Sequence, residues 1–219
     1  MKGGKFPVCR DERARLALYS GHRTPAATPH AGAAIRITLT LGRMESPLLI
    51  LMRHAKTELA SPSGDDFSRA LTPRGSADAL AMGGWLHARY GDLAQVVSST
   101  ALRTRQTVAA LAVAWGETPP PVRWDPALYL AELDTLLGVV EAERQAATLL
   151  VGHNPGLEDL VRYLVRDVER NVGTPKIMPT SAVYVLELPS RRGRPAPGSA
   201  VLRAHMRPKR LTPTDGGGG

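Results

Sequence analysis

Short apolar runs alternate with segments of helical periodicity through the middle of the chain. Four runs are candidates for buried strands, at residues 47–52, 93–98, 147–152 and 182–188. Four further segments carry apolar residues at helical spacing, over 72–90, about 100–115, 133–146 and from 154 onward. Alternation of this kind predicts an α/β fold with a mostly parallel central sheet and helices on both faces.

The two ends of the chain lack this periodicity, and they carry its basic charge. Residues 1–43 hold 8 Lys and Arg against 2 acids, and residues 189–219 hold 7 against 1. The formal net charge of +8 therefore belongs to the ends, and the middle is mildly acidic. We expect a basic arm over 1–43 that is either disordered or, if Met44 is the native start, not part of the protein. We further expect a folded domain over 44–188 and a basic loop-like tail over 189–219. Residues 200–206 are a candidate for a last edge strand.

Composition excludes several classes of protein. The sequence has no apolar run of 18 residues, so we expect no membrane span. The first ten residues are basic but lack the apolar segment of a secretory signal. Cys9 is the single cysteine, and no Cys/His cluster has the spacing of a zinc site. We therefore expect a cytoplasmic protein that needs no metal or other cofactor.

Arginine and histidine side chains follow three of the predicted strands. The first strand ends at Arg53 and His54, the second is followed one helical turn later by Arg103, and the third ends at His153. Ligands of parallel sheets bind at the carboxyl ends of the strands, which share one edge. A single histidine at a strand end is more often structural. Together, however, two guanidinium groups and two imidazoles predict a site for a tetrahedral phosphate dianion, helped by the positive end of the helix near residue 100.

These motifs resemble those of the histidine phosphatase superfamily, with its phosphoglycerate-mutase-like fold, over residues 46–188. Within it the chain is similar to the short branch of SixA-type phosphohistidine phosphatases. The matching segments are LMRHAKTE at 51–58, Asp66 with RALTPRG at 69–75, VVSSTALRTRQT at 96–107, and LLVGHNPGLEDLV at 149–161. Ala55 stands where much of the superfamily has glycine, which favours the short branch over the mutases. The resemblance implies a three-layer sandwich and makes 44–188 the catalytic domain.

The resemblance also implies a metal-independent mechanism. His54 would attack phosphorus to form a phosphohistidine enzyme, which water then hydrolyses; a neutral imidazole needs no separate base for this step. Arg53 and Arg103 would hold the non-bridging oxygens. His153 would donate a hydrogen bond to the same oxygens and could carry a proton for it. Lys56 is a further candidate for contact with an anionic substrate, or a charge at the rim.

The proton donor is less clear from the motifs. Larger members of the superfamily carry a glutamate two residues after a leucine in the loop that here reads WDPALYLAELD, and that position is Leu130. Glu132, Asp65 and Asp66 are the candidate substitutes. Alternatively, Glu132 is a solvated carboxylate at a helix start, and Asp66 pairs with Arg69. Weak provision of an acid favours a leaving group that departs without a proton, such as the imidazole of phosphohistidine.

Three functions remain open from the sequence. The first is dephosphorylation of protein phosphohistidine, with a phosphohistidine-bearing protein as the partner. The second is a broad phosphomonoesterase that acts on a sugar or nucleotide phosphate. The third is a non-catalytic phosphate-binding module whose basic tails contact nucleic acid. The tails lack interleaved aromatic residues, and both histidines and both arginines are present, so the enzymes are favoured.

Overall fold

The computed structural model describes residues 46–211 except 144, 175 and 191. Its sheet has six strands in the order β3-β2-β4-β1-β5-β6. Neighbouring strands among β1 to β4 pair in parallel, whereas β5 and β6 join the other side of β1 in antiparallel fashion. The sheet is therefore mostly parallel, as the alternating pattern predicts. The strands are β1 (Leu48–Arg53), β2 (Gln95–Ser98), β3 (Val122–Trp124), β4 (Ala147–Gly152), β5 (Val183–Glu187) and β6 (Val201–Met206).

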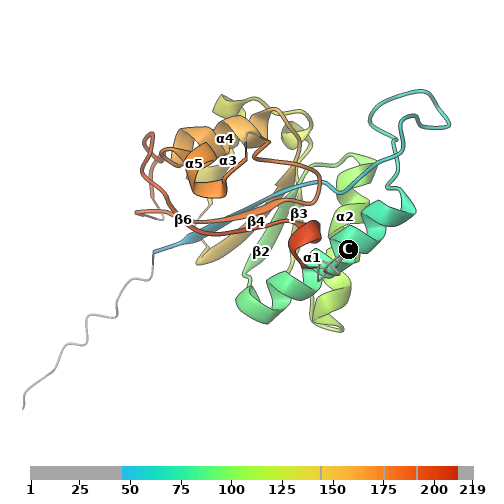
Figure 1. Cartoon of the computed structure of the whole chain (residues 1–219), viewed down its shortest axis with the longest axis horizontal. Helices are drawn as coiled ribbons and strands as arrows, with labels where there is room; N and C mark the ends of the chain where they lie inside the picture. Colours follow the sequence, from blue (N-terminus) through green and yellow to red (C-terminus); the bar gives the residue numbers. More distant parts are fainter. Residues whose placement is uncertain (1–45, 144, 175, 191, 212–219) are drawn as a thin grey trace, which may run out of the picture. The chain divides into compact units, whose positions relative to one another are not determined.

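Helices cover both faces of this sheet (Figure 1). One face carries α1 (Pro73–Tyr90) and α2 (Leu102–Ala112). The other carries α3 (Leu133–Ala142), α4 (Gly156–Leu164) and the short α5 (Val168–Val172). Three single-turn 3₁₀ helices complete the elements found in the described residues: η1 (Val113–Trp115), η2 (Pro126–Leu128) and η3 (Pro208–Arg210). The predicted three-layer α/β sandwich is confirmed.

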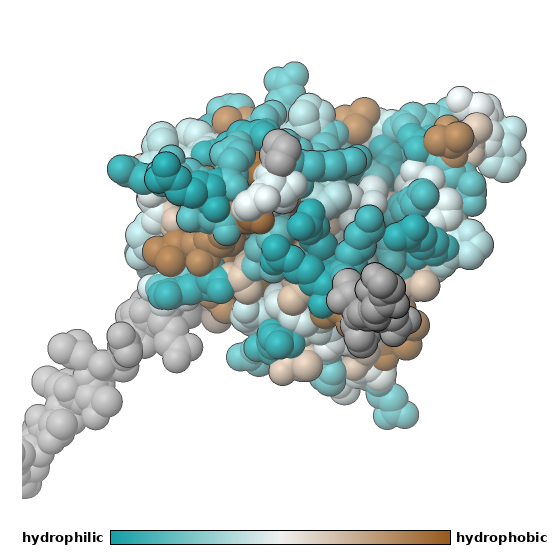
Figure 2. All heavy atoms as spheres, in the orientation of Figure 1, coloured by the Kyte–Doolittle hydropathy of each residue, from teal (hydrophilic) through white to brown (hydrophobic). Residues whose placement is uncertain are grey.

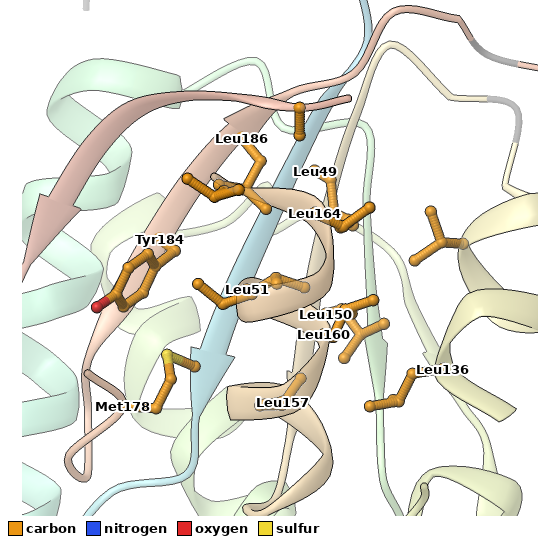
Figure 3. Packing of buried hydrophobic residues seen from close by; sticks show 14 of the residues in the cluster. Leu49, Leu51, Leu136, Leu150, Leu157, Leu160, Leu164, Met178, Tyr184 and Leu186 are labelled. Carbon is orange, nitrogen blue, oxygen red and sulfur yellow. The ribbon is translucent and has the colours of Figure 1, made fainter. Parts of the chain in front are cut away.

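Each face of the sheet has its own hydrophobic core. Leu49 and Leu51 of β1 point to the face that α3 and α4 cover, where they pack with Leu160 (Figure 3). Ile50 and Met52, the alternate residues of β1, join the core under α1 and α2. Because successive side chains of a strand point to opposite faces, burial on both sides requires a continuous apolar run. On the face seen in Figure 2, hydrophilic residues dominate the surface.

The boundaries of the helices differ in detail from those predicted. Thr72 caps α1 as expected, because its hydroxyl accepts a hydrogen bond from the Gly75 amide at 2.9 Å. The helix predicted to 115 becomes 3₁₀ after Ala112, and α3 ends at Ala142 instead of 146. The sequence pattern does not reveal β3 or α5, because three and five residues are too few to establish a period.

The ends of the chain are described only in part. The expected arm over 1–43 and the start at Met44 lie outside the described residues, as does everything after 211. Strand β6 lies at the residues proposed for a last edge strand and pairs with β5. No helix in the described part of the chain is long and apolar enough to cross a membrane.

Candidate active site

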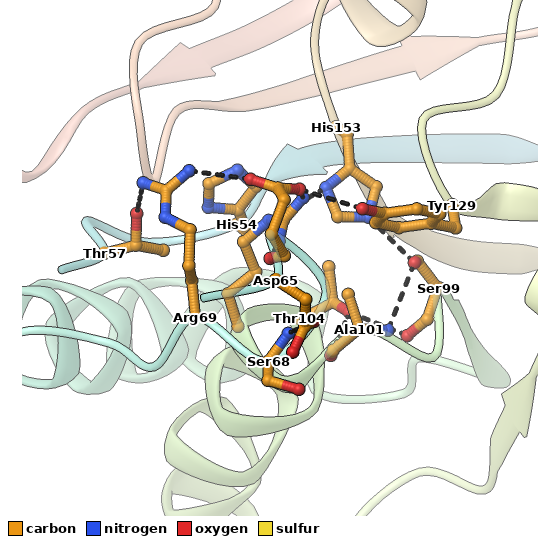
Figure 4. Close-up of polar contacts among 12 residues, drawn as sticks. His54, Thr57, Asp65, Ser68, Arg69, Ser99, Ala101, Thr104, Tyr129 and His153 are labelled. Carbon is orange, nitrogen blue, oxygen red and sulfur yellow. Dashed lines mark hydrogen bonds and ion pairs between the residues drawn. The ribbon is translucent and has the colours of Figure 1, made fainter. Parts of the chain in front are cut away.

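Three neighbouring parallel strands end at the same edge of the sheet. Strand β4 lies between β2 and β1, with Arg53 opposite Gly152 in the register. The pairing continues just past the strands: the His54 amide donates to the carbonyl of Gly152 at 3.1 Å, and the Ser99 amide donates to that of Val151 at 3.1 Å. This register brings His54, Ser99 and His153 together at the strand ends (Figure 4).

His54 is held as a neutral imidazole with one free nitrogen. Its side chain is only 8% exposed, and its Nδ1 lies 2.8 Å from the carbonyl oxygen of Ala55. A carbonyl can only accept, so Nδ1 carries the proton and Nε2 keeps its lone pair. Burial, followed by the nearby Arg53 and Arg103, lowers the pKa of His54 to about 4. His54 is therefore uncharged at neutral pH.

His153 lies beside His54, with ring centroids 5.3 Å apart and planes tilted by 52°. Its Nδ1 accepts a hydrogen bond from Arg103 Nε at 3.3 Å, so the proton is on Nε2, which donates to Ser99 Oγ at 2.8 Å. Burial, and then the charge of Arg103, lowers the pKa of His153 to about 3. His153 is therefore neutral in this structure, and its protonation on binding a phosphoryl dianion stays a prediction.

Arg53 and Arg103 bring two positive charges close to the two histidines. Arg103, in the first turn of α2, is 2% exposed, and its two terminal nitrogens both donate to Asp66. Arg53 donates from one terminal nitrogen to the carbonyl of Met178 at 3.0 Å. Its buried Nε has no hydrogen-bond partner among the described residues. Burial lowers the pKa of Arg53 from its usual value. An anion bound beside Arg53 would supply the acceptor that the Arg53 Nε lacks.

Asp66 does not fit the role of a proton donor. Its carboxylate accepts hydrogen bonds from Arg69 at 2.8 Å, from Arg103 at 2.9 Å and from the Tyr129 hydroxyl at 2.9 Å. The hydrogen bond from Arg69, with those from Tyr129 and Arg103, lowers the pKa of Asp66 to about 2. The group is therefore ionised at neutral pH and has no proton to give. This corrects the first reading of Asp66 and agrees with the alternative, a pair with Arg69.

The other two candidate acids lie differently. The Asp65 carboxylate closes a turn, because it accepts from the amide of Ser68 at 2.8 Å and from the hydroxyl of Ser63. These bonds lower the pKa of Asp65 as well. Glu132 is exposed at the N-cap of α3 and lines a separate hollow of about 630 Å³ beyond Pro155. The structure records no contact of either carboxylate with His54 or His153 within the described residues.

The side chain of Lys56 is exposed, whereas its backbone is held by a hydrogen bond. The Lys56 carbonyl accepts from the Thr72 amide at 2.9 Å, which ties the end of the first motif to the start of α1. The exposed side chain lies outside the buried group of His54, His153 and Arg103, and its contact with a substrate stays a prediction.

Sequence reasoning missed two residues that shape the site. Ser99 fixes the proton of His153, and the ring of Tyr129 packs edge-on to His153 at a centroid distance of 5.5 Å. Ser99 could have been found from its place directly after a strand. Tyr129 carries no such pattern, because it lies in the irregular loop between η2 and α3.

The chemistry that this geometry supports is binding of an oxyanion beside a nucleophilic nitrogen. Two neutral histidines lie ring to ring; Arg103 donates to one of them, and Arg53 immediately precedes the other. The described residues contain no group of three or more His, Cys, Asp and Glu side chains placed to hold a metal ion. A neutral imidazole and a pair of guanidinium groups are sufficient for attack on a phosphoryl group.

Comparisons with known proteins all point to the same protein family. A model of the histidine phosphatase superfamily (branch 1) matches residues 49–135. An uncharacterized protein of Mycobacterium tuberculosis (strain H37Rv) is 33% identical over 158 residues, which are 69% of this chain and 96% of that protein. An uncharacterized protein of Mycobacterium leprae is 31% identical over 148 residues, covering 64% of this chain and 89% of that protein.

Similar solved structures support the same family. One assigned to the phosphohistidine phosphatase SixA of Agrobacterium tumefaciens matches with a TM-score of 0.63 and 27% identity, over 74% of this chain and 97% of that one. Another with the same assignment, from Nakamurella multipartitia, matches with a TM-score of 0.61 and 29% identity, over 74% and 96%. This chain belongs to the histidine phosphatase superfamily, in its SixA-type branch, and is a phosphatase with a histidine nucleophile.

Proposed function

We propose that this phosphatase removes the phosphoryl group from phosphohistidine on proteins, with His54 as the nucleophile. The observation that carries the proposal is the hydrogen bond from His54 Nδ1 to the Ala55 carbonyl, which leaves the lone pair of Nε2 free close to the positive charges of Arg53 and Arg103. A histidine fixed in this tautomer can attack phosphorus without first losing a proton.

The proposed reaction proceeds in two steps. In the first, His54 Nε2 forms a bond to phosphorus while the bond from phosphorus to the leaving nitrogen breaks, and its electron pair stays on the departing imidazole. In the second, water attacks the phosphohistidine enzyme, the P–N bond to His54 breaks, and inorganic phosphate leaves. Both steps pass through a transition state with negative charge on the non-bridging oxygens.

Arg53, Arg103 and His153 are the groups that stabilise this charge. Arg53 retains a buried Nε–H without a partner among the described residues, and Arg103 lies against both His153 and the adjacent loop. His153 is neutral, and a bound dianion would favour its protonation by opposing the charge of the arginines. Donors that are already in place cost no reorganisation in the transition state.

The choice of leaving group follows from the carboxylates. Asp66 is ionised, Asp65 closes a turn, and Glu132 lies at the start of α3. Within the described part of the chain, these three groups supply no protonated acid beside His54. An alkoxide leaving group needs such an acid, whereas the imidazole of phosphohistidine can leave as a neutral ring if its other nitrogen already carries a proton. The assignment of two similar structures to SixA is consistent with this substrate.

Relative rates on two classes of substrate test the proposal. We expect a phosphohistidine-bearing protein and phosphoramidate to turn over faster than simple alkyl phosphates, by at least tenfold in kcat/KM. An aryl phosphate with a good leaving group serves as the control, because it needs no acid and should react even if alkyl phosphates do not. Faster turnover of sugar or nucleotide phosphates would contradict the leaving-group argument and favour the broad phosphomonoesterase.

A further inference from the structure

We propose that the Asp66 carboxylate occupies the place of a phosphoryl group on Arg103 and Arg69, and that substrate must displace it to bind. The inference rests on the proposed function, because it takes Arg103 as a phosphate-binding group. It adds to that function a competing anion that the chain itself provides, and it makes Arg69 and the Tyr129 hydroxyl additional donors for the phosphoryl oxygens.

The contacts of Asp66 are those of a bound oxyanion. One carboxylate oxygen accepts from Arg69 at 2.8 Å, and the other accepts from Arg103 and from the Tyr129 hydroxyl, each at 2.9 Å. Guanidinium groups bind carboxylates and phosphates with the same fork of donors. The two carboxylate oxygens therefore mark positions that phosphoryl oxygens can take when Asp66 moves away.

Arg103 has few donors left for a substrate in this arrangement. Its Nε donates to His153, one terminal nitrogen donates to the backbone carbonyl of Asp66 at 2.6 Å, and the other donates to the Asp66 carboxylate. A phosphoryl dianion that approaches this guanidinium meets a negative charge already bound there. Like charges within a few ångströms repel, so the two anions exclude one another.

The displacement requires little movement of the backbone. The Asp66 side chain is 44% exposed, so it can rotate towards solvent. The next residue is anchored, because the Phe67 carbonyl accepts from the Leu102 amide at 3.1 Å and the Phe67 ring packs against Tyr129 at a centroid distance of 5.0 Å. Rotation of the Asp66 side chain frees the terminal nitrogen of Arg103 that binds its carboxylate, while the loop keeps its place against α2.

A different role for Asp66 makes the opposite prediction. If Asp66 stays in place and serves to orient Arg103, then removing its charge should weaken phosphate binding. If it competes with phosphate, then removing its charge should strengthen binding. The sign of the effect therefore separates a competing anion from an orienting one.

The test is the affinity of Asp66→Asn for inorganic phosphate, measured by calorimetry and as product inhibition. Asparagine keeps the shape of the side chain but loses its charge, and we expect phosphate to bind about tenfold more tightly than to the wild type, the order of one charge-assisted contact. Asp65→Asn is the matched control: it removes the same charge from the same loop, and its amide oxygen still accepts from Ser68. Its phosphate affinity should equal that of the wild type.

The outcomes separate this inference from the proposed function. Suppose that the wild type turns over substrate but Asp66→Asn binds phosphate no more tightly than the wild type does. This result overturns the competing role of Asp66 and leaves the proposed function standing. An equal gain in Asp65→Asn overturns it too, because the effect would then be one of net charge. If neither wild type nor Asp66→Asn binds phosphate or turns over substrate, the proposed function fails and this inference with it. Asp66→Ser, with the same expected gain, replaces Asp66→Asn if that variant does not fold.

Discussion

Lowering the pH protonates the proposed nucleophile, and the structure predicts the pH at which activity is lost. His54 must be neutral to attack phosphorus, and its pKa is lowered to about 4 by burial and by the neighbouring arginines. The ordinary pKa of histidine is about 6.5. The acid limb of kcat/KM, which reports on the free enzyme, should therefore fall near pH 4 instead of near pH 6.5.

The expected effect on activity is already large at pH 5. With a pKa of about 4, roughly nine tenths of His54 is neutral at pH 5, whereas an unperturbed imidazole would be only about 3% neutral. The protein should thus be about thirtyfold more active at pH 5 than a solvated histidine nucleophile would allow. The same burial that lowers the pKa produces this advantage, since it penalises the charged form of the ring.

The assay is the rate of phosphoenzyme formation from phosphoramidate in single turnovers between pH 4 and pH 8. The titration of the substrate is measured separately and divided out. An acid limb near pH 6.5 would refute the reasoning, because it would mean that the nucleophile is solvated or is another group.

Stability must be followed in the same series, because the same histidines weaken the fold in acid. Below pH 6.5 the unfolded chain binds protons at His54 and His153, while the folded chain, with pKa values of about 4 and about 3, does not. Stability therefore falls as the pH drops from about 6.5 towards 4, by about 1.4 kcal/mol per pH unit for each histidine. The two together cost about 4 kcal/mol at pH 5, and circular dichroism at each pH shows whether the chain is still folded.

Three substitutions, one of them with a matched control variant, give further checks. Arg103→Ala should lower kcat/KM by about 10²–10³, the usual loss for one donor to the transition-state oxyanion, measured in steady-state kinetics on a variant shown to be folded. Gly156→Ala should destabilise the fold by about 1–3 kcal/mol in urea unfolding, because its Cβ would lie 1.9 Å from the Ala131 carbonyl oxygen. Gly138→Ala, in an open position of α3, is its control and should be neutral or stabilising. Lys56→Ala should raise KM a few-fold at low salt and leave kcat unchanged, as expected for an exposed charge; a large fall in kcat would place Lys56 at the reacting group.

The sequence was sufficient to predict the parts of the site that depend on strand ends. Arg53, His54 and His153 follow buried apolar runs directly, and parallel strands necessarily end at one edge. Their convergence is visible in the pattern because it depends on local periodicity and one general rule. The fold class follows from the same alternation.

The parts that could not be predicted depend on contacts between distant loops. Asp66 binds Arg103, which is 37 positions later, and Tyr129, which is 63 positions later. No periodicity relates these residues, so the sequence left Asp66 as a candidate acid. The tautomer of His153 could not be predicted for a similar reason: the proton is placed by Ser99 and Arg103 through side-chain geometry.

The most direct test of the account is to locate the phosphoryl group during turnover. Rapid quench after mixing with labelled phosphoramidate, followed by mass spectrometry under conditions that preserve phosphohistidine, should place the label on His54. The label should disappear in His54→Ala together with turnover. Label on another residue, or activity in His54→Ala within tenfold of the wild type, would contradict the assignment of His54 as the nucleophile.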